Sequence, residues 1–84
     1  MDNIHELRLN RQFFPDVASG KKPFELRLND RNFKPGDTVI FEEWDGRDYT
    51  DNRIVAEITY VLDEYTCIGL QRNYVILGIK ILTN

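Results

Sequence analysis

Residues that bind metals or form disulfides are nearly missing from this 84-residue chain, which has one cysteine, Cys67, and one histidine, His5. One cysteine forms no internal disulfide, and a single His with a single Cys excludes a metal site of the usual His and Cys kinds. We therefore expect no metal and no cofactor. Cys67 is expected to be a small, buried or half-buried apolar group rather than a reactive thiol.

Long apolar runs are also missing. No segment is long enough to span a membrane, and residues 1–6 have neither the basic start nor the apolar core of a secretion signal. No linker or low-complexity tract divides the chain, so residues 1–84 are expected to form one domain with a compact core. We expect a cytoplasmic protein with no membrane partner.

Positive charge is in deficit, with 11 Lys and Arg residues against 14 Asp and Glu residues and a net charge of -3. The chain as a whole should repel nucleic acid, which excludes a salt-driven binder of long duplexes. A nucleotide or a short single strand held in a local cationic cleft stays compatible with this balance.

Alternation of apolar and polar residues predicts strands over 4–9, 24–28, 53–62 and 74–82. Lys34-Pro35-Gly36-Asp37 predicts a type II turn that leads into a further strand over 38–44. The long polar loop expected between Trp44 and Asn52 is either a lid or a hairpin connection whose aromatics cover the end of the sheet. The residues expected to face the core are Phe24, Leu26 and Leu28, and then Ile54, Ala56, Ile58, Tyr60 and Leu62. In the first and last strands, the residues expected to share one face are His5, Leu7 and Leu9, and Val75, Leu77, Ile79 and Ile81.

One short helix is predicted within residues 10–19. The apolar residues Phe13, Phe14, Val17 and Ala18 form one helical stripe. Pro15 is accepted in the first turn of a helix but not farther in, so regular helix should begin at about Gln12 or later. Gly20 is placed to end this helix with a positive φ.

Charges of both signs gather around the strand predicted at 24–28. Glu25 and Arg27 share one face of it, Lys22 precedes it and Arg31 follows it. This pattern suits a polar, partly anionic ligand, and the alternative is a structural ion pair on a solvated face. Asp30 is expected to be structural, facing away from Arg27 or capping the turn before Phe33.

Gly20, Lys22, Glu25 and Arg27 spell Gly-x-Lys-x-x-Glu-x-Arg, which resembles the signature of the ASCH domains in the PUA-like superfamily. The segments 5–8, 29–33, 36–37 and 74–79 extend the likeness to the small bacterial and phage ASCH-like family called DUF3850. The resemblance implies an α+β fold, a small PUA-like β-barrel of about five to six mostly antiparallel strands. One short helix would lie between the first strand and the signature strand, and a cleft would lie beside both.

For function, the resemblance implies a module that binds RNA or a modified nucleoside, with Lys22, Glu25 and Arg27 at its centre. Arg27 can hold a phosphate through two parallel hydrogen bonds, and Glu25 can accept a bond from the amine of a base. Additional binding candidates are Arg31, Lys21 and Arg8 along a nucleic-acid backbone, with Trp44 and Tyr49 as stacking surfaces. A charged patch that binds another protein is a third reading.

The alternative function is a small hydrolase that uses the same cleft. Some ASCH-like proteins remove the acyl group of N4-acetylcytidine with the signature lysine, a threonine and a later glutamate, and others have been assigned ribonuclease activity. Lys22 matches that lysine and is, with Glu25, a catalytic candidate. Glu25 departs from the threonine, and Glu57 and Glu64 are only loose matches for the later acid. His5 is expected to be a hydrogen-bonded, half-buried histidine rather than an acid or base.

Overall fold

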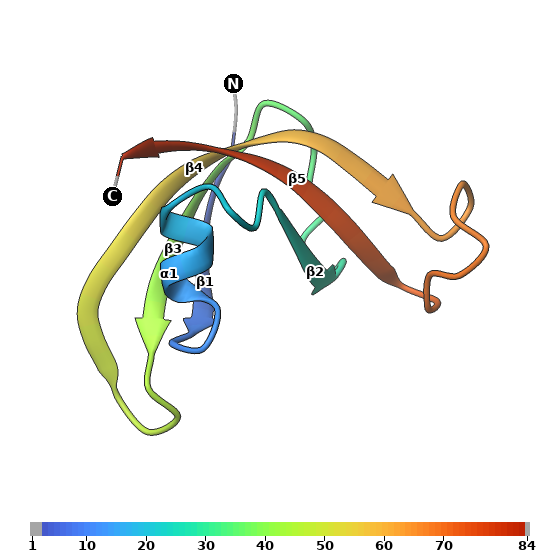
Figure 1. Cartoon of the computed structure of the whole chain (residues 1–84). Coiled ribbons are helices and arrows are strands. Elements are labelled where there is room, and N and C mark those ends of the chain that lie inside the picture. The colour runs from blue at the N-terminus through green and yellow to red at the C-terminus, as the bar shows by residue number, and fades with distance from the viewer. Residues whose placement is uncertain (1–2, 84) are drawn as a thin grey trace.

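Residues 3–83, which the computed structural model describes, form one curled sheet of five strands around a short helix (Figure 1). The sheet order is β1-β3-β4-β5-β2, and all neighbours are antiparallel except the parallel pair β1 and β3. The elements are β1 (Ile4–Asn10), α1 (Phe14–Ala18), β2 (Phe24–Leu28), β3 (Thr38–Trp44), β4 (Tyr49–Asp63) and β5 (Tyr74–Thr83). The predicted mostly antiparallel, strand-rich architecture with one early helix is confirmed. The sheet curls into an open half-barrel.

The core lies on the concave face of the sheet, where alternate residues of each strand are buried. The predicted inward face of the first half of β4 is confirmed, and the residues predicted to share one face in β1 and in β5 lie on the core side, because alternate residues of a strand point to one face. The helix adds Val17, which is fully buried, and the connection after β2 adds Phe33. The buried apolar residues are Leu7, Leu9, Val17, Phe33, Val39, Phe41, Ile54, Ala56, Ile58, Val75, Leu77 and Ile79.

Helix α1 is shorter than its apolar stripe. It begins at Phe14 with Pro15 in its first turn, and Phe13 precedes it, 39% exposed. Gly20 has a φ of 81°, and its N–H donates to the carbonyl of Val17 at 3.1 Å, so the predicted positive φ at the end of the helix is confirmed. Within residues 3–83, no helix is long and apolar enough to cross a membrane.

The second half of β4 does not follow the predicted alternation. The pairing with β5 moves from Ile58 opposite Ile79 to Tyr60 opposite Gly78, so Thr59 is an extra residue, a β-bulge. A bulge exchanges the two faces of the strand beyond it. Val61 therefore packs against the core and Tyr60 is 62% exposed, which makes the predicted inward positions of Tyr60 and Leu62 wrong.

The predicted faces of β2 are also reversed. Phe24, Leu26 and Leu28 were expected in the core but are 48%, 54% and 48% exposed, whereas Glu25 is only 4% exposed. The cause is the pair of cations beside Glu25, Lys22 and Arg27, which compensate the buried carboxylate. Because Glu25 and Arg27 point inward, the alternate residues Phe24, Leu26 and Leu28 point outward.

The connection between β3 and β4 is a tight turn rather than the predicted long loop. Trp44 already pairs with Tyr49, so the turn spans residues 45–48. Asp45 accepts hydrogen bonds of 2.8 Å from the backbone N–H groups of Arg47 and Asp48, which lower its pKa. The predicted length of the loop is wrong, because the two strands stay paired up to this turn, whereas the hairpin connection, the alternative to a lid, is confirmed.

Candidate functional site

A cleft of about 710 Å³ lies along the open seam of the half-barrel, between the edge strands β1 and β2. Its charged lining residues are three arginines and two glutamates, so the seam is locally positive in a chain of net charge -3. The residues that border it are Glu6, Leu7, Arg8, Leu9, Asn10, Phe13, Glu25, Leu26, Arg27, Leu28, Arg31, Trp44, Tyr49 and Tyr74.

The signature residues Lys22, Glu25 and Arg27 form a closed ion-pair triad at the base of this seam. Lys22 Nζ donates to Glu25 Oε1, and Arg27 Nε donates to Glu25 Oε2 at 3.1 Å. The Lys22 ammonium also lies 4.5 Å from the centre of the Phe13 ring, a cation–π contact. Both cations are thus engaged within the protein, and Lys22 does not border the cleft.

Two arginine side chains join β1 and β2 across the seam. Arg27 Nη2 donates to the backbone carbonyl of Arg8 at 2.7 Å, and Arg31 Nη1 donates to that of Glu6 at 3.1 Å. Edge strands present such backbone acceptors because no neighbouring strand pairs with them on that side. The two guanidinium groups therefore bond backbone carbonyls that a neighbouring strand would otherwise bond, and they hold the two edges of the half-barrel together.

Arg8 differs from the other two arginines. Its guanidinium carbon lies 4.7 Å from the centre of the Trp44 ring, and within residues 3–83 its side chain makes no hydrogen bond or ion pair. Trp44 in turn contacts Tyr49 edge to face, with ring centres 5.0 Å apart, and Tyr49 is 52% exposed. One wall of the cleft is therefore a cation with free donors on the Trp44 ring, with Tyr49 beside that ring.

Some predicted residues lie elsewhere. Lys21 is exposed, and neither it nor the two candidate later acids, Glu57 and Glu64, borders the cleft. Glu64 instead accepts a hydrogen bond of 3.0 Å from the backbone N–H of Asn73. The structure thus brings all the predicted binding residues to the cleft except Lys21 and Lys22. Lys22 contacts the cleft residue Glu25 but does not border the cleft itself.

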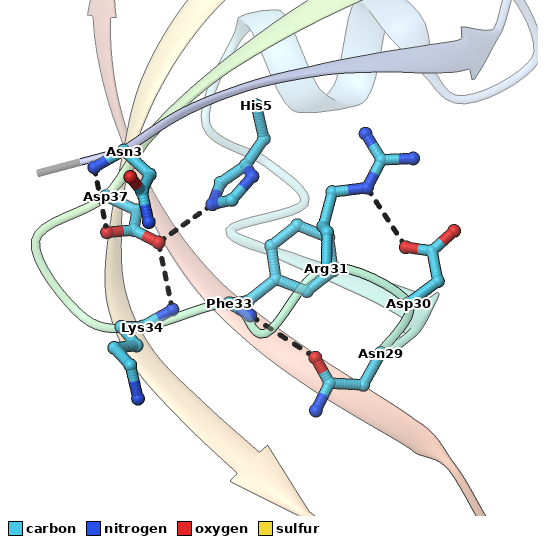
Figure 2. A network of polar contacts seen from close by, with 8 residues as sticks. All are labelled: Asn3, His5, Asn29, Asp30, Arg31, Phe33, Lys34 and Asp37. Atoms are coloured by element: carbon cyan, nitrogen blue, oxygen red, sulfur yellow. Dashed lines mark hydrogen bonds and ion pairs between the residues drawn. The ribbon is translucent and has the colours of Figure 1, made fainter.

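His5 is buried in a structural network near the start of β1 (Figure 2). Its Nε2 atom lies 2.8 Å from Asp37 Oδ2, and its ring meets the Phe33 ring at a centre distance of 4.8 Å. Burial raises the pKa of Asp37, but hydrogen bonds from His5 and from the backbone N–H groups of Lys34 and Asn3 outweigh it and lower that pKa. The geometry matches the expected hydrogen-bonded histidine, away from the cleft.

The segment after β2 is held by its own polar contacts, as Figure 2 shows. Asn29, rather than Asp30, accepts the hydrogen bond from the Phe33 N–H, at 3.3 Å. Asp30 accepts a bond of 3.0 Å from Arg31 Nε, and this bond lowers the pKa of Asp30. Asp30 therefore does not cap the turn before Phe33, and it pairs with the arginine that reaches Glu6.

Sequence reasoning missed Glu6, Asn10 and Tyr74, which also border the cleft. It also missed the backbone carbonyls that Arg27 and Arg31 bind. Only the sheet order, which makes β1 and β2 the two edges, brings these groups together. Within the part of the chain that the structure describes, no three His, Cys, Asp or Glu side chains group as a metal site would need.

The chain resembles known proteins over most of its length. Residues 4–79, from the start of β1 to the middle of β5, match DUF3850, a domain of unknown function. The chain belongs to the DUF3850 family. A relative from Escherichia phage P2, an uncharacterized 12.9 kDa protein in the GpA 3′ region, is 43% identical over 63 residues. That alignment covers 75% of this chain and 58% of the phage protein, so the chain spans well under two thirds of the relative's length.

Proposed function

We propose that this DUF3850 domain binds RNA, as a short single strand or a nucleotide, in the cleft between β1 and β2. The observation that carries the proposal is Arg8, a cation with no ion-pair partner in residues 3–83 that rests on Trp44 beside the exposed Tyr49. Cationic side chains next to accessible aromatic rings are what single-stranded nucleic acids bind. The assignment to the ASCH domains of the PUA-like superfamily, which rests on the signature residues, belongs to the same proposal.

The proposal divides the work between two groups of residues. Arg8 contacts a phosphate through its free donors, and Tyr49 offers a face on which a base stacks. Arg31, whose side chain is 40% exposed, extends the phosphate contact along the seam. Glu25 and Arg27 border the cleft, and Lys22, which does not border it, holds Glu25 through an ion pair.

The hydrolase alternative has less support from the same geometry. A general base needs a free lone pair within reach of the proton that it removes. Both oxygens of Glu25 already accept bonds from cations, Oε1 from Lys22 and Oε2 from Arg27. Glu25 is also only 4% exposed, so little of its carboxylate is open to a substrate. Binding without chemistry is therefore the function that we favour.

The chain carries its own reporter for this proposal, because Trp44 is its single tryptophan and borders the cleft. A short single-stranded RNA added at low salt should quench or shift the Trp44 fluorescence with a saturating dependence. A duplex RNA of the same length should have a much weaker effect, because paired bases cannot stack on Tyr49. No saturable change with any single strand or nucleotide would contradict the proposed function.

A further inference from the structure

An uncharged apolar strip covers the outer face of β2, β5 and the end of β4. The register places Phe24 opposite Gly78 and Gly78 opposite Tyr60, so the three lie side by side across the sheet. In the next row, Leu26 lies opposite Ile76 and Ile76 opposite Leu62, and Leu28 lies opposite Tyr74 beyond that. We call these residues the outer strip: Phe24, Leu26, Leu28, Tyr60, Leu62, Tyr74, Ile76 and Gly78.

The outer strip differs from scattered surface apolar residues in its continuity. Leu26 is 54% exposed and Tyr60 62% exposed, and none of the eight positions carries a charge in a chain that is 30% charged. Loss of charged residues with aromatic enrichment is the composition of the centre of a protein interface. The residues that contradicted the sequence prediction, Phe24, Leu26 and Leu28 on β2 and Tyr60 and Leu62 after the bulge, all belong to this strip.

We propose that two copies of this chain pack face to face through the outer strip and form a symmetric dimer. The half-exposed side chains Phe24, Leu26, Leu28 and Tyr60 each offer on the order of 100 Å², a typical share of a large apolar side chain. With the partly buried Leu62, Tyr74 and Ile76, one strip presents roughly 500 Å², so two strips hide about 1,000 Å² of mainly apolar surface, the lower limit for a specific interface.

A second copy fits this surface because the strip is complementary to itself. A two-fold dimer needs one patch that can face its own image, and an uncharged, three-strand face meets that condition without opposing like charges. Two such sheets pack about 10 Å apart with interdigitating side chains. Leu26, Leu28 and Tyr74 also border the cleft, so the dimer places each cleft beside the interface.

Two tyrosines five positions apart provide a matched test. Tyr60 lies in the outer strip, and Tyr65 lies in the loop after β4, where it is 87% exposed. Sedimentation equilibrium of the protein without nucleic acid should give a monomer–dimer equilibrium for the wild type and for Tyr65→Glu. Tyr60→Glu places a charge inside the interface and should raise the dissociation constant by about tenfold or more.

Each other outcome overturns a dimer formed through the outer strip. A wild type that stays monomeric at the highest soluble concentration contradicts it directly. A Tyr60→Glu protein that dimerises as tightly as the wild type shows that a different surface is used. Equal loss of dimer in Tyr60→Glu and Tyr65→Glu shows an effect of charge alone. Circular dichroism of both variants confirms that each is folded, which is expected because both side chains are exposed. The result is independent of whether the cleft binds RNA.

Discussion

Arg27 on β2 donates a hydrogen bond of 2.7 Å to the backbone carbonyl of Arg8 on β1, and this bond joins the two edge strands of the half-barrel. The same side chain neutralises the buried carboxylate of Glu25. A signature residue that sequence reasoning assigned to ligand binding is therefore part of what closes the seam. Arg8, which is not in the signature, is left with its own donors facing the cleft.

Replacing Arg27 should lower stability more than replacing a surface arginine. Arg27→Ala removes the bond across the seam and one of two partners of a buried carboxylate, so we expect a loss of about 2–3 kcal/mol in the free energy of unfolding. Arg53→Ala removes an exposed ion pair with Glu42 and should cost well under 1 kcal/mol. Urea denaturation measures both. Equal midpoints for Arg27→Ala and the wild type would contradict the seam-closing role.

How far the sequence predicted the fold differs from strand to strand. Alternation located β1 and β5 within about a residue, since a half-buried strand repeats every two residues, and the Pro-Gly turn at 34–37 located the start of β3. In β2 alternation separated two faces but did not identify the inner one, because it depended on compensation of Glu25 by its two cations. In β4 the single extra residue at Thr59 exchanged the faces, and no residue type there signals a bulge.

The sequence predicted several residues of the site but not how they are arranged. Arg8, Trp44 and Tyr49 were named as candidates, but their common wall depends on Arg8 lying above the Trp44 ring and on the hairpin that pairs Trp44 with Tyr49. The cleft itself follows from sheet order, which sets residues about 20 positions apart along an open seam. The local periodicity of a sequence does not predict which strands become the edges of the sheet.

Gly20 should be sensitive to substitution through its backbone alone. An added Cβ at Gly20 or at Gly69 meets nothing within 4 Å, but Gly20 has a φ of 81°. Gly20→Ala should therefore cost about 1–2 kcal/mol of stability, since left-handed backbone is unfavourable for residues with a Cβ. Gly69→Ala is the control and should be close to neutral in thermal denaturation. Comparable losses in both variants would refute the capping argument.

Asp37 should make stability fall in acid. Its pKa in the folded state lies below the ordinary value of 3.8, so its ionised form stabilises the fold above that pH and the stabilisation is lost as pH falls through the lowered pKa. Asp37→Asn should cost about 1–3 kcal/mol at neutral pH, because buried donors lose an acceptor, and the difference from wild type should shrink below pH 3.8.

Asp30→Asn is the matched control for Asp37→Asn. The Asp30 pKa is lowered too, by its bond to Arg31, but the side chain is 48% exposed and water screens the pair. Denaturant titrations at several pH values should therefore show little change for Asp30→Asn. A constant Asp37→Asn penalty across the acid range would mean that ionised Asp37 does not act as described.

The purified protein should not deacylate N4-acetylcytidine. Glu25 stands where the resemblance implies a threonine, and both of its oxygens accept bonds from cations. Following the nucleoside by absorbance with wild type, Glu25→Thr and Lys22→Ala tests this. Turnover by the wild type that disappears in Lys22→Ala would make the protein an amidohydrolase; activity only in Glu25→Thr would fit our view.

The central claim is that Arg8, packed on the Trp44 ring, binds the nucleic acid. The most direct test is the fluorescence anisotropy of a labelled, short single-stranded RNA at low salt. The RNA is titrated with the Arg8→Ala and Arg72→Ala variants. Both variants lose one positive charge, but Arg72 is exposed in the loop before β5 and does not border the cleft. Loss of a charged contact should weaken binding by Arg8→Ala on the order of tenfold to a hundredfold, with Arg72→Ala close to wild type. Equal affinity of the two variants would contradict the account.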